Sequence, residues 1–165
     1  MNIYLKQKVF SWGDKFSAYN EAGEEVYSVK GQVFSFGKKL HISDVNGQEI
    51  AFIHEKVFAW RPKYFIEYGG KTIEVVKNIT FLKPKYTVKE MGLTISGDFF
   101  AHSYGAINGD NKTAFGVSKK WFTWGDTYQI EVNERFDPVT ALCIVLVIDA
   151  CVAKQHAASA AASSH

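Results

Sequence analysis

The residues that could act as nucleophiles or metal ligands do not fall into the spacings that such chemistry requires. The chain has no Gly-x-Ser-x-Gly segment, which would expose a hydrolase serine on a strained turn. Cys143 and Cys151 lie in an apolar segment, where a thiol stays protonated and unreactive. The histidines are scattered, with no pair at i and i+4 and no cysteine at metal-ligand spacing. The sequence therefore predicts no catalytic residues, no metal site and no cofactor.

Three acids could still take part in proton transfer. Asp149 lies within the apolar segment, where an ionised carboxylate is unfavourable unless it is paired or hydrogen-bonded. It could be a raised-pKa acid in a cleft. It could instead be a structural residue near a rim, bonded to loop N–H groups or to an aromatic O–H or N–H. We favour the structural role, because acid–base catalysis needs a base as well as an acid, and the sequence offers no base to accompany Asp149. Asp14 and Asp126 each follow Gly, which favours turns over a carboxylate dyad.

Basic residues recur in pairs beside aromatic segments. The candidates for binding an anionic ligand are Lys38 with Lys39, Arg61 with Lys63, Lys83 with Lys85, and Lys119 with Lys120. Because the pairs occur at similar points of successive repeats, we expect several of them to gather on one rim. Such a rim would keep the protein soluble and protect sheet edges. It could also bind anionic lipid headgroups, with about 1 kcal/mol from each Lys or Arg near a charged membrane.

The apolar segment itself predicts a buried helix over about residues 138–154. Asp137 followed by Pro138 is typical of a helix start. The following residues are apolar on every side, so the helix must be buried all round. Residues 139–153 number only 15, whereas a bilayer span needs roughly 20, so we predict a core helix and no transmembrane segment. The cysteines would lie roughly 12 Å apart on this helix, too far for a disulfide, which favours a reduced, cytoplasmic protein.

The chain before the helix consists of repeated hairpins. Similar aromatic segments begin at residues 9, 33 and 57, which are 24 residues apart, and Gly-containing turn pairs such as Asn46-Gly47 follow a similar rhythm. Two strands and a turn in each repeat predict an antiparallel meander. A sheet of ten or more strands closes to remove its edges, and the helix is long enough to fill it. We therefore predict a mainly β protein, a closed antiparallel barrel around a central hydrophobic C-terminal helix.

The length of 165 residues favours a single domain, which we place at residues 1–154. Residues 155–165 are rich in Ala and Ser and carry no core pattern, so we expect a frayed or disordered tail. The formal charge of +2 gives no indication of nucleic-acid binding. Residues 1–8 contain no apolar core of a signal peptide, so we expect a cytoplasmic protein that is at most peripheral to a membrane.

Several motifs resemble the LURP-one-related family and its small bacterial members. In order, they are Lys83-Pro84-Lys85-Tyr86-Thr87-Val88, Gly97-Asp98-Phe99, Phe122-Thr123-Trp124-Gly125-Asp126-Thr127-Tyr128 and the closing apolar helix. The resemblance covers residues 1 to about 154. It implies a twelve-stranded barrel around a hydrophobic helix, similar to the tubby C-terminal domain and the phospholipid scramblases. Tubby domains bind phosphoinositides, and no catalytic residue comes with the resemblance. The calcium-binding segment of the scramblases has no acidic counterpart beyond the helix here.

We therefore expect a non-enzymatic binding or scaffold module that docks at an anionic, phosphoinositide-like membrane surface or on a protein partner. One alternative is a carrier that holds a small hydrophobic ligand in its barrel, as many closed barrels do. A further alternative is a scramblase-like lipid-handling protein. The helix discriminates between the first two, because a helix that fills the lumen leaves no room for a ligand.

Overall fold

A computed structural model of the chain describes residues 1–6, 15–32, 35–79, 83–122 and 125–164, and describes only the backbone of residues 121, 122, 125 and 126. The first aromatic segment, half of the second, and Asp14 lie outside the described residues, as does the side chain of Asp126. The described elements are β1 (Asn2–Lys6), β2 (Lys15–Tyr19), β3 (Glu25–Gly31), β4 (Lys39–Ser43), β5 (Glu49–Glu55), β6 (Lys63–Tyr68), β7 (Lys71–Ile79), β8 (Pro84–Val88), the 3-10 helix η1 (Lys89–Met91), β9 (Leu93–Asp98), β10 (Ser103–Ile107), β11 (Thr113–Phe122), β12 (Gly125–Val132) and α1 (Pro138–Ser163).

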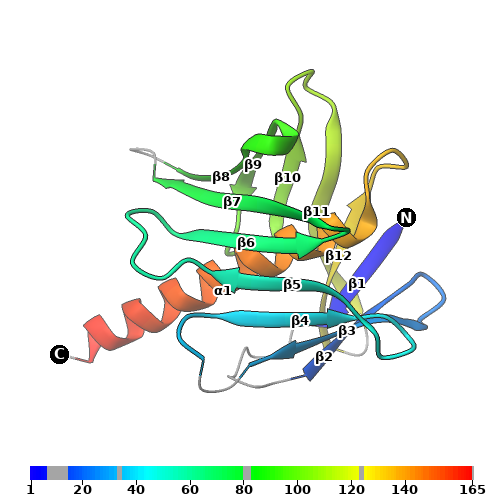
Figure 1. Cartoon of the computed structure of the whole chain (residues 1–165), viewed down its shortest axis with the longest axis horizontal. Coiled ribbons are helices and arrows are strands. Elements are labelled where there is room, and N and C mark those ends of the chain that lie inside the picture. The colour runs from blue at the N-terminus through cyan, green and yellow to red at the C-terminus, as the bar shows by residue number, and fades with distance from the viewer. Residues whose placement is uncertain (7–14, 33–34, 80–82, 123–124, 165) are drawn as a thin grey trace.

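The strands form a closed antiparallel barrel in which each strand pairs with its neighbours in sequence. β1 completes the circle by pairing with both β2 and β12. Among the described strands, closure removes the two free edges that an open sheet would have. Figure 1 shows α1 passing through the barrel, with its last turns protruding beyond the strands. The predicted fold, a twelve-stranded barrel around a C-terminal helix, is confirmed by the described elements.

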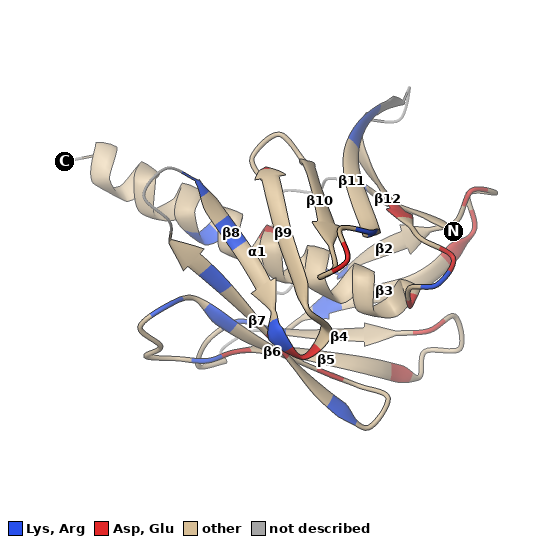
Figure 2. Ribbon diagram, turned by 90° about the horizontal axis from the view of Figure 1, so that it is seen from above, with Lys and Arg blue, Asp and Glu red and all other residues tan. Residues whose placement is uncertain are grey.

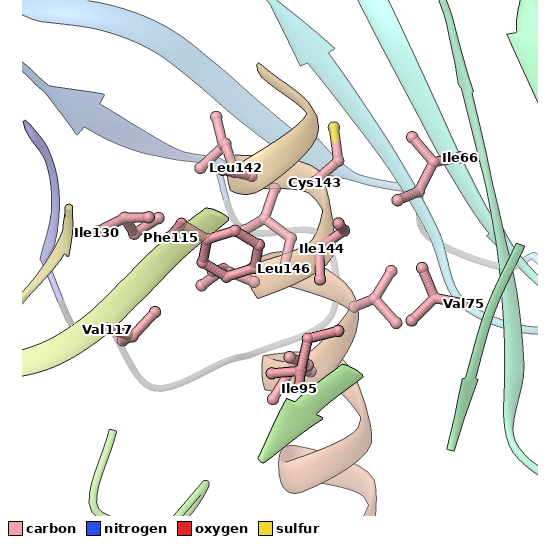
Figure 3. Packing of buried hydrophobic residues seen from close by; sticks show 14 of the residues in the cluster. Ile66, Val75, Ile95, Phe115, Val117, Ile130, Leu142, Cys143, Ile144 and Leu146 are labelled. Atoms are coloured by element: carbon pink, nitrogen blue, oxygen red, sulfur yellow. The ribbon is translucent and has the colours of Figure 1, made fainter. Parts of the chain in front are cut away.

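The interior is made by alternate strand residues packing on α1. In β4, for example, Leu40 and Ile42 are buried while His41 between them faces outward. Residues 139–151 of α1 are all buried, and Leu142 and Ile144 are 0% exposed. Figure 3 shows these residues among inward side chains of the strands, such as Phe115. The lumen is therefore occupied by the helix.

The start of α1 follows the predicted pattern. Asp137 is the N-cap residue, and its Oδ2 accepts a hydrogen bond of 2.7 Å from the backbone N–H of Thr140. Pro138 occupies the first turn, where its missing N–H leaves no bond unmade. Tyr68 Oη donates to Asp137 Oδ1 at 3.2 Å, which ties the helix start to the end of β6.

The end of α1 differs from the prediction. The helix continues to Ser163, although we expected it to end near Lys154 and a frayed tail to follow. Residues 154–163 are exposed and rich in Ala, the residue with the highest helix propensity, so the segment can be helical without a core pattern. Two contacts hold its first turn. Lys77 Nζ donates to Gln155 Oε1 at 3.2 Å, and the Phe100 and His156 rings meet edge to face at 5.0 Å.

Candidate functional site

The two ends of the barrel carry opposite charge. Because neighbouring strands are antiparallel, one end collects the starts of the even-numbered strands and the ends of the odd-numbered ones, and α1 protrudes from this end. We call it the basic end. Figure 2 shows most of the Lys and Arg positions toward it and most acids toward the other, which we call the acidic end. The described acids of the acidic end include Glu21, Glu24, Glu25, Asp44, Glu49, Glu90, Asp110, Glu134 and Asp137.

The eight basic residues singled out in the sequence all lie at the basic end, although not in one patch. Three pairs flank the starts of β4, β6 and β8, which belong to one continuous stretch of the barrel wall: Lys38 with Lys39, Arg61 with Lys63, and Lys83 with Lys85. Lys119 and Lys120 lie near the end of β11, and β9 and β10 separate them from the others. The structure thus brings six of the eight to one side of the rim.

Lys63 and Arg61 contact polar side chains of the barrel wall. Lys63 Nζ forms an ion pair with Glu74 Oε1 at 2.9 Å, across the β6–β7 hairpin. Arg61 Nη1 donates to Asn78 Oδ1 at 2.9 Å. Among the described residues, no carboxylate lies within ion-pair distance of Lys85, which is exposed. The cations therefore differ in how readily they can turn toward a ligand.

A groove of about 690 Å³ runs between the protruding part of α1 and the loops before β4 and β6. The cations that line it are Lys38, Lys56, Arg61, Lys77 and Lys154, and the acid among its lining residues is Glu55. Glu55 Oε1 accepts from Lys154 Nζ at 2.5 Å, and its Oε2 accepts from the backbone N–H of Lys38 at 3.0 Å. The carboxylate is thereby satisfied by the protein, and the groove keeps an excess of positive charge.

Sequence reasoning missed Lys56, Lys77 and Lys154 as members of this site. Lys154 comes from α1, and Lys77 comes from a strand whose start lies at the other end of the barrel. The signal that could have found them is strand direction. Residues near the end of an odd-numbered strand share a rim with residues near the start of the following even-numbered strand.

Exposed aromatic side chains flank the groove. Phe58 is 92% exposed and Trp60 is 98% exposed, both in the β5–β6 loop, and Phe36 before β4 is 71% exposed. The Phe36 and Phe58 rings lie 5.8 Å apart. Phe58 has a φ of 61°, a conformation that is unfavourable for a residue with a side chain. The loop therefore presents a large apolar residue where glycine would be the easier choice for folding.

Asp149 lies inside the barrel, near the basic end, and is absent from the lining of the groove. The hydroxyl of Tyr128 donates a hydrogen bond to Asp149 Oδ2. His102 Nδ1 lies 3.8 Å from Asp149 Oδ1, and the His102 ring stacks on Tyr128 at 4.5 Å. Burial raises the pKa of Asp149 to about 7, and the Tyr128 hydrogen bond acts in the opposite direction. Asp149 thus connects α1 to β12 and to the turn before β10.

The cysteines and the helix give no further chemical centre in the described part of the chain. Both thiols are free and buried, and burial raises the pKa of Cys151 to about 11. Within the described residues, no three His, Cys, Asp or Glu side chains are grouped to hold a metal ion. By length and composition α1 could cross a bilayer, but 72% of its most apolar window is buried inside the barrel, as in the core helix of a soluble protein.

Comparison with known proteins adds a family and a fold. A model of the family described as LURP-one-related matches residues 1–149. The uncharacterized protein YxjI of Bacillus subtilis (strain 168) is 35% identical over 150 residues, which cover 90% of this chain and 92% of YxjI. The X-ray structure of a protein from Arabidopsis thaliana superposes with a TM-score of 0.65 at 15% identity. That match covers 91% of this chain and 90% of the plant chain, and at this identity it shows the fold alone.

Proposed function

The chain belongs to the LURP-one-related family, as its motifs indicated, and from this premise we propose that it is a non-enzymatic module that docks on an anionic membrane surface. The docking face is the basic end, and the protein is cytoplasmic and peripheral to the membrane. The groove beside α1 receives phospholipid headgroups, and the aromatic loops insert at the level of the headgroups. The observation that carries this proposal is the coincidence of the cation-lined groove with the nearly fully exposed Phe58 and Trp60.

The positive charge and the exposed apolar surface both support the basic end as the docking face. Among the described residues that line the groove, five cations accompany one acid, Glu55, and each cation near a charged membrane contributes about 1 kcal/mol. Trp is enriched at membrane interfaces because its ring is apolar and its N–H is polar. Trp60 is 98% exposed, so its side chain buries almost no surface against the described fold. Its position is explained by contact with a partner surface that is both anionic and apolar, which is the chemistry of a phospholipid headgroup layer.

The same geometry bears on the alternatives. A carrier that holds its ligand inside the barrel would need the lumen, and residues 139–151 of α1 occupy it. Aromatic and basic residues also occur in protein interfaces, so the liposome experiment described next also tests the alternative of a protein partner. Among the described residues, no observation supports a scramblase-like activity.

The test is sedimentation of the purified protein with liposomes of phosphatidylcholine alone, and with liposomes that also contain phosphatidylglycerol or a phosphoinositide. We expect binding only to the anionic liposomes and weaker binding at high salt, because salt screens exposed charges. Equal sedimentation with neutral and anionic liposomes, or none with either, would contradict the proposal and direct the search to protein partners.

Two variants locate the docking face. In the triple variant Lys56→Glu, Arg61→Glu, Lys85→Glu, all three altered side chains are exposed at the basic end. The matched control changes Lys71, Lys89 and Lys112 to Glu, which alters the net charge equally at the acidic end. We expect the first variant to lose binding by about a hundredfold or more and the control to keep most of it. Equal losses would show that net charge, and not the basic end, drives the interaction.

A further inference from the structure

A second concave site lies at the acidic end, opposite the groove. It is a pocket of about 1,150 Å³, bounded by the start of β7, the η1 turn, the β10–β11 turn and the loop that leads into α1. Its apolar surface comes from Ile73, Met91, Leu93, Ala114 and Phe136. Ile73, Leu93 and Ala114 are less than 9% exposed, so the apolar side chains lie beneath the surface of the barrel mouth.

The walls of this pocket are held by hydrogen bonds within the protein. The Asn133 N–H donates to the Ala114 carbonyl at 2.9 Å, and the Phe136 N–H donates to the Asn133 carbonyl at 2.9 Å. In the β10–β11 turn, Asn108 Oδ1 accepts from the Lys112 N–H at 2.9 Å. The Gly92 N–H closes η1 by donating to the Lys89 carbonyl at 3.1 Å. A site with fixed walls loses little conformational entropy when a ligand binds.

Positive charge gathers on this pocket although the surrounding end is acidic. The described Lys and Arg residues of the acidic end are Lys71, Lys89, Lys112 and Arg135, and only Lys89 is absent from the pocket lining. Glu90 is the acid among the described lining residues, which therefore carry a net charge of +2 (three cations and one carboxylate). Among the described residues, neither Lys112 nor Arg135 has a carboxylate within ion-pair distance.

We propose that this pocket binds a small amphipathic carboxylate, such as a medium-chain fatty acid. The apolar body would pack on Ile73, Leu93 and Phe136, and the carboxylate would accept hydrogen bonds from Arg135 and Lys112. Arg presents paired N–H donors whose geometry matches a carboxylate. A membrane surface does not fit this end, because the acids around the pocket would repel an anionic bilayer, whereas a small ligand enters among the cations. The pocket volume is of the order expected for a small-molecule site.

This inference is independent of membrane docking, since the two sites lie at opposite ends of the barrel. The test is calorimetric titration of the full chain with decanoate below its micelle concentration. Butyrate, decanol and decyltrimethylammonium are titrated in parallel to separate the apolar and charged contributions. We expect decanoate to bind at least about tenfold more tightly than each of the other three, because only decanoate offers both a carboxylate and a long apolar body.

Variants then assign the binding to the pocket. Arg135→Gln combined with Lys112→Gln is expected to weaken decanoate binding about tenfold or more. Lys89→Gln, which removes a cation of the same end outside the pocket, is expected to leave the affinity within about twofold. Thermal unfolding checks that the variants are folded. The proposal is overturned if decanoate and decanol bind equally, if no decanoate binding occurs, or if both variants bind decanoate like the original chain.

Discussion

Asp149 gives the stability of the fold a pH dependence whose sign follows from burial. Burial raises its pKa to about 7, above the value of roughly 3.9 for an unfolded chain. Between these values the folded state binds the proton more strongly, so the free energy of unfolding falls as pH rises from about 4 to about 7 and then levels off. Asp149→Asn removes this titration. We expect the stability of the Asn variant, relative to the original chain, to increase over that range by on the order of 2–4 kcal/mol.

Urea unfolding of both proteins at several pH values measures this difference, and a difference that does not change with pH would contradict it.

Asp149→Leu is the companion variant. At about pH 5 the carboxyl group is protonated and still accepts from Tyr128, whereas leucine leaves that buried hydroxyl without an acceptor. We expect the Leu variant to be about 1–3 kcal/mol less stable than the original chain at this pH.

Gly97 is a residue whose identity the backbone dictates. Its φ is +139°, and a Cβ added there would lie 2.5 Å from the Ser103 carbonyl oxygen and 2.6 Å from Tyr104 Cα. Backbone atoms of the paired strand β10 cannot move aside easily, so we expect Gly97→Ala to lower the free energy of unfolding by about 2–5 kcal/mol.

Gly109 provides the control for Gly97, because a Cβ there meets nothing within 4 Å and its φ is not in the left-handed region. Thermal and urea unfolding of Gly109→Ala should lie within about 0.5 kcal/mol of the original chain. Equal losses in the two variants would mean that the close approach of β9 and β10 does not decide the choice of glycine at residue 97.

At the level of elements, α1 has two halves with different physical roles. The buried half was predictable, because Asp137-Pro138 begins a run of residues that are apolar on all sides. The exposed half was not, because Ala and Ser carry no hydrophobic period and favour a helix only through local propensity. The regular spacing of the hairpins likewise predicted the strands and the closure of the sheet. The direction of each strand decides at which end of the barrel a residue lies. Assigning residues to the two ends therefore required the start and end of every strand, which the sequence did not provide.

Because one half of α1 is buried and the other is exposed, we expect changes in the two halves to lower the free energy of unfolding by different amounts. A chain that ends at Lys154 loses the contacts of Gln155 and His156, both of which are exposed. We expect its free energy of unfolding to fall by less than about 1 kcal/mol. Ile148→Ala removes a side chain that is 0% exposed and should lower that free energy by about 2–5 kcal/mol. Urea unfolding measures both. A truncated chain that does not fold would show that the protruding turns are part of the folding unit.

At the scale of the whole molecule, the barrel separates two kinds of surface that the sequence mixes. Lys38 and Glu49 are 11 residues apart in the chain, yet they lie at opposite ends, because β4 runs the height of the barrel between them. The basic pairs could be proposed from the sequence because they recur with the repeats. The pocket at the acidic end could not, since it is built from four turns and loops whose residues share no motif.

This polarity predicts one orientation of the bound protein on a membrane. Val45 and Ile79 are 68% and 76% exposed and lie at the acidic end and the basic end, respectively. A cysteine at either position can be labelled with an environment-sensitive dye, because Cys143 and Cys151 are buried and burial raises the pKa of both thiols.

If the basic end faces the bilayer, anionic vesicles will shift the emission of the dye at residue 79 toward that of an apolar environment. The dye at residue 45 will report water throughout, since the height of the barrel separates it from the lipid. Equal shifts at both positions would mean that the protein binds without a fixed orientation, and a shift at residue 45 alone would mean that the acidic end is the docking face.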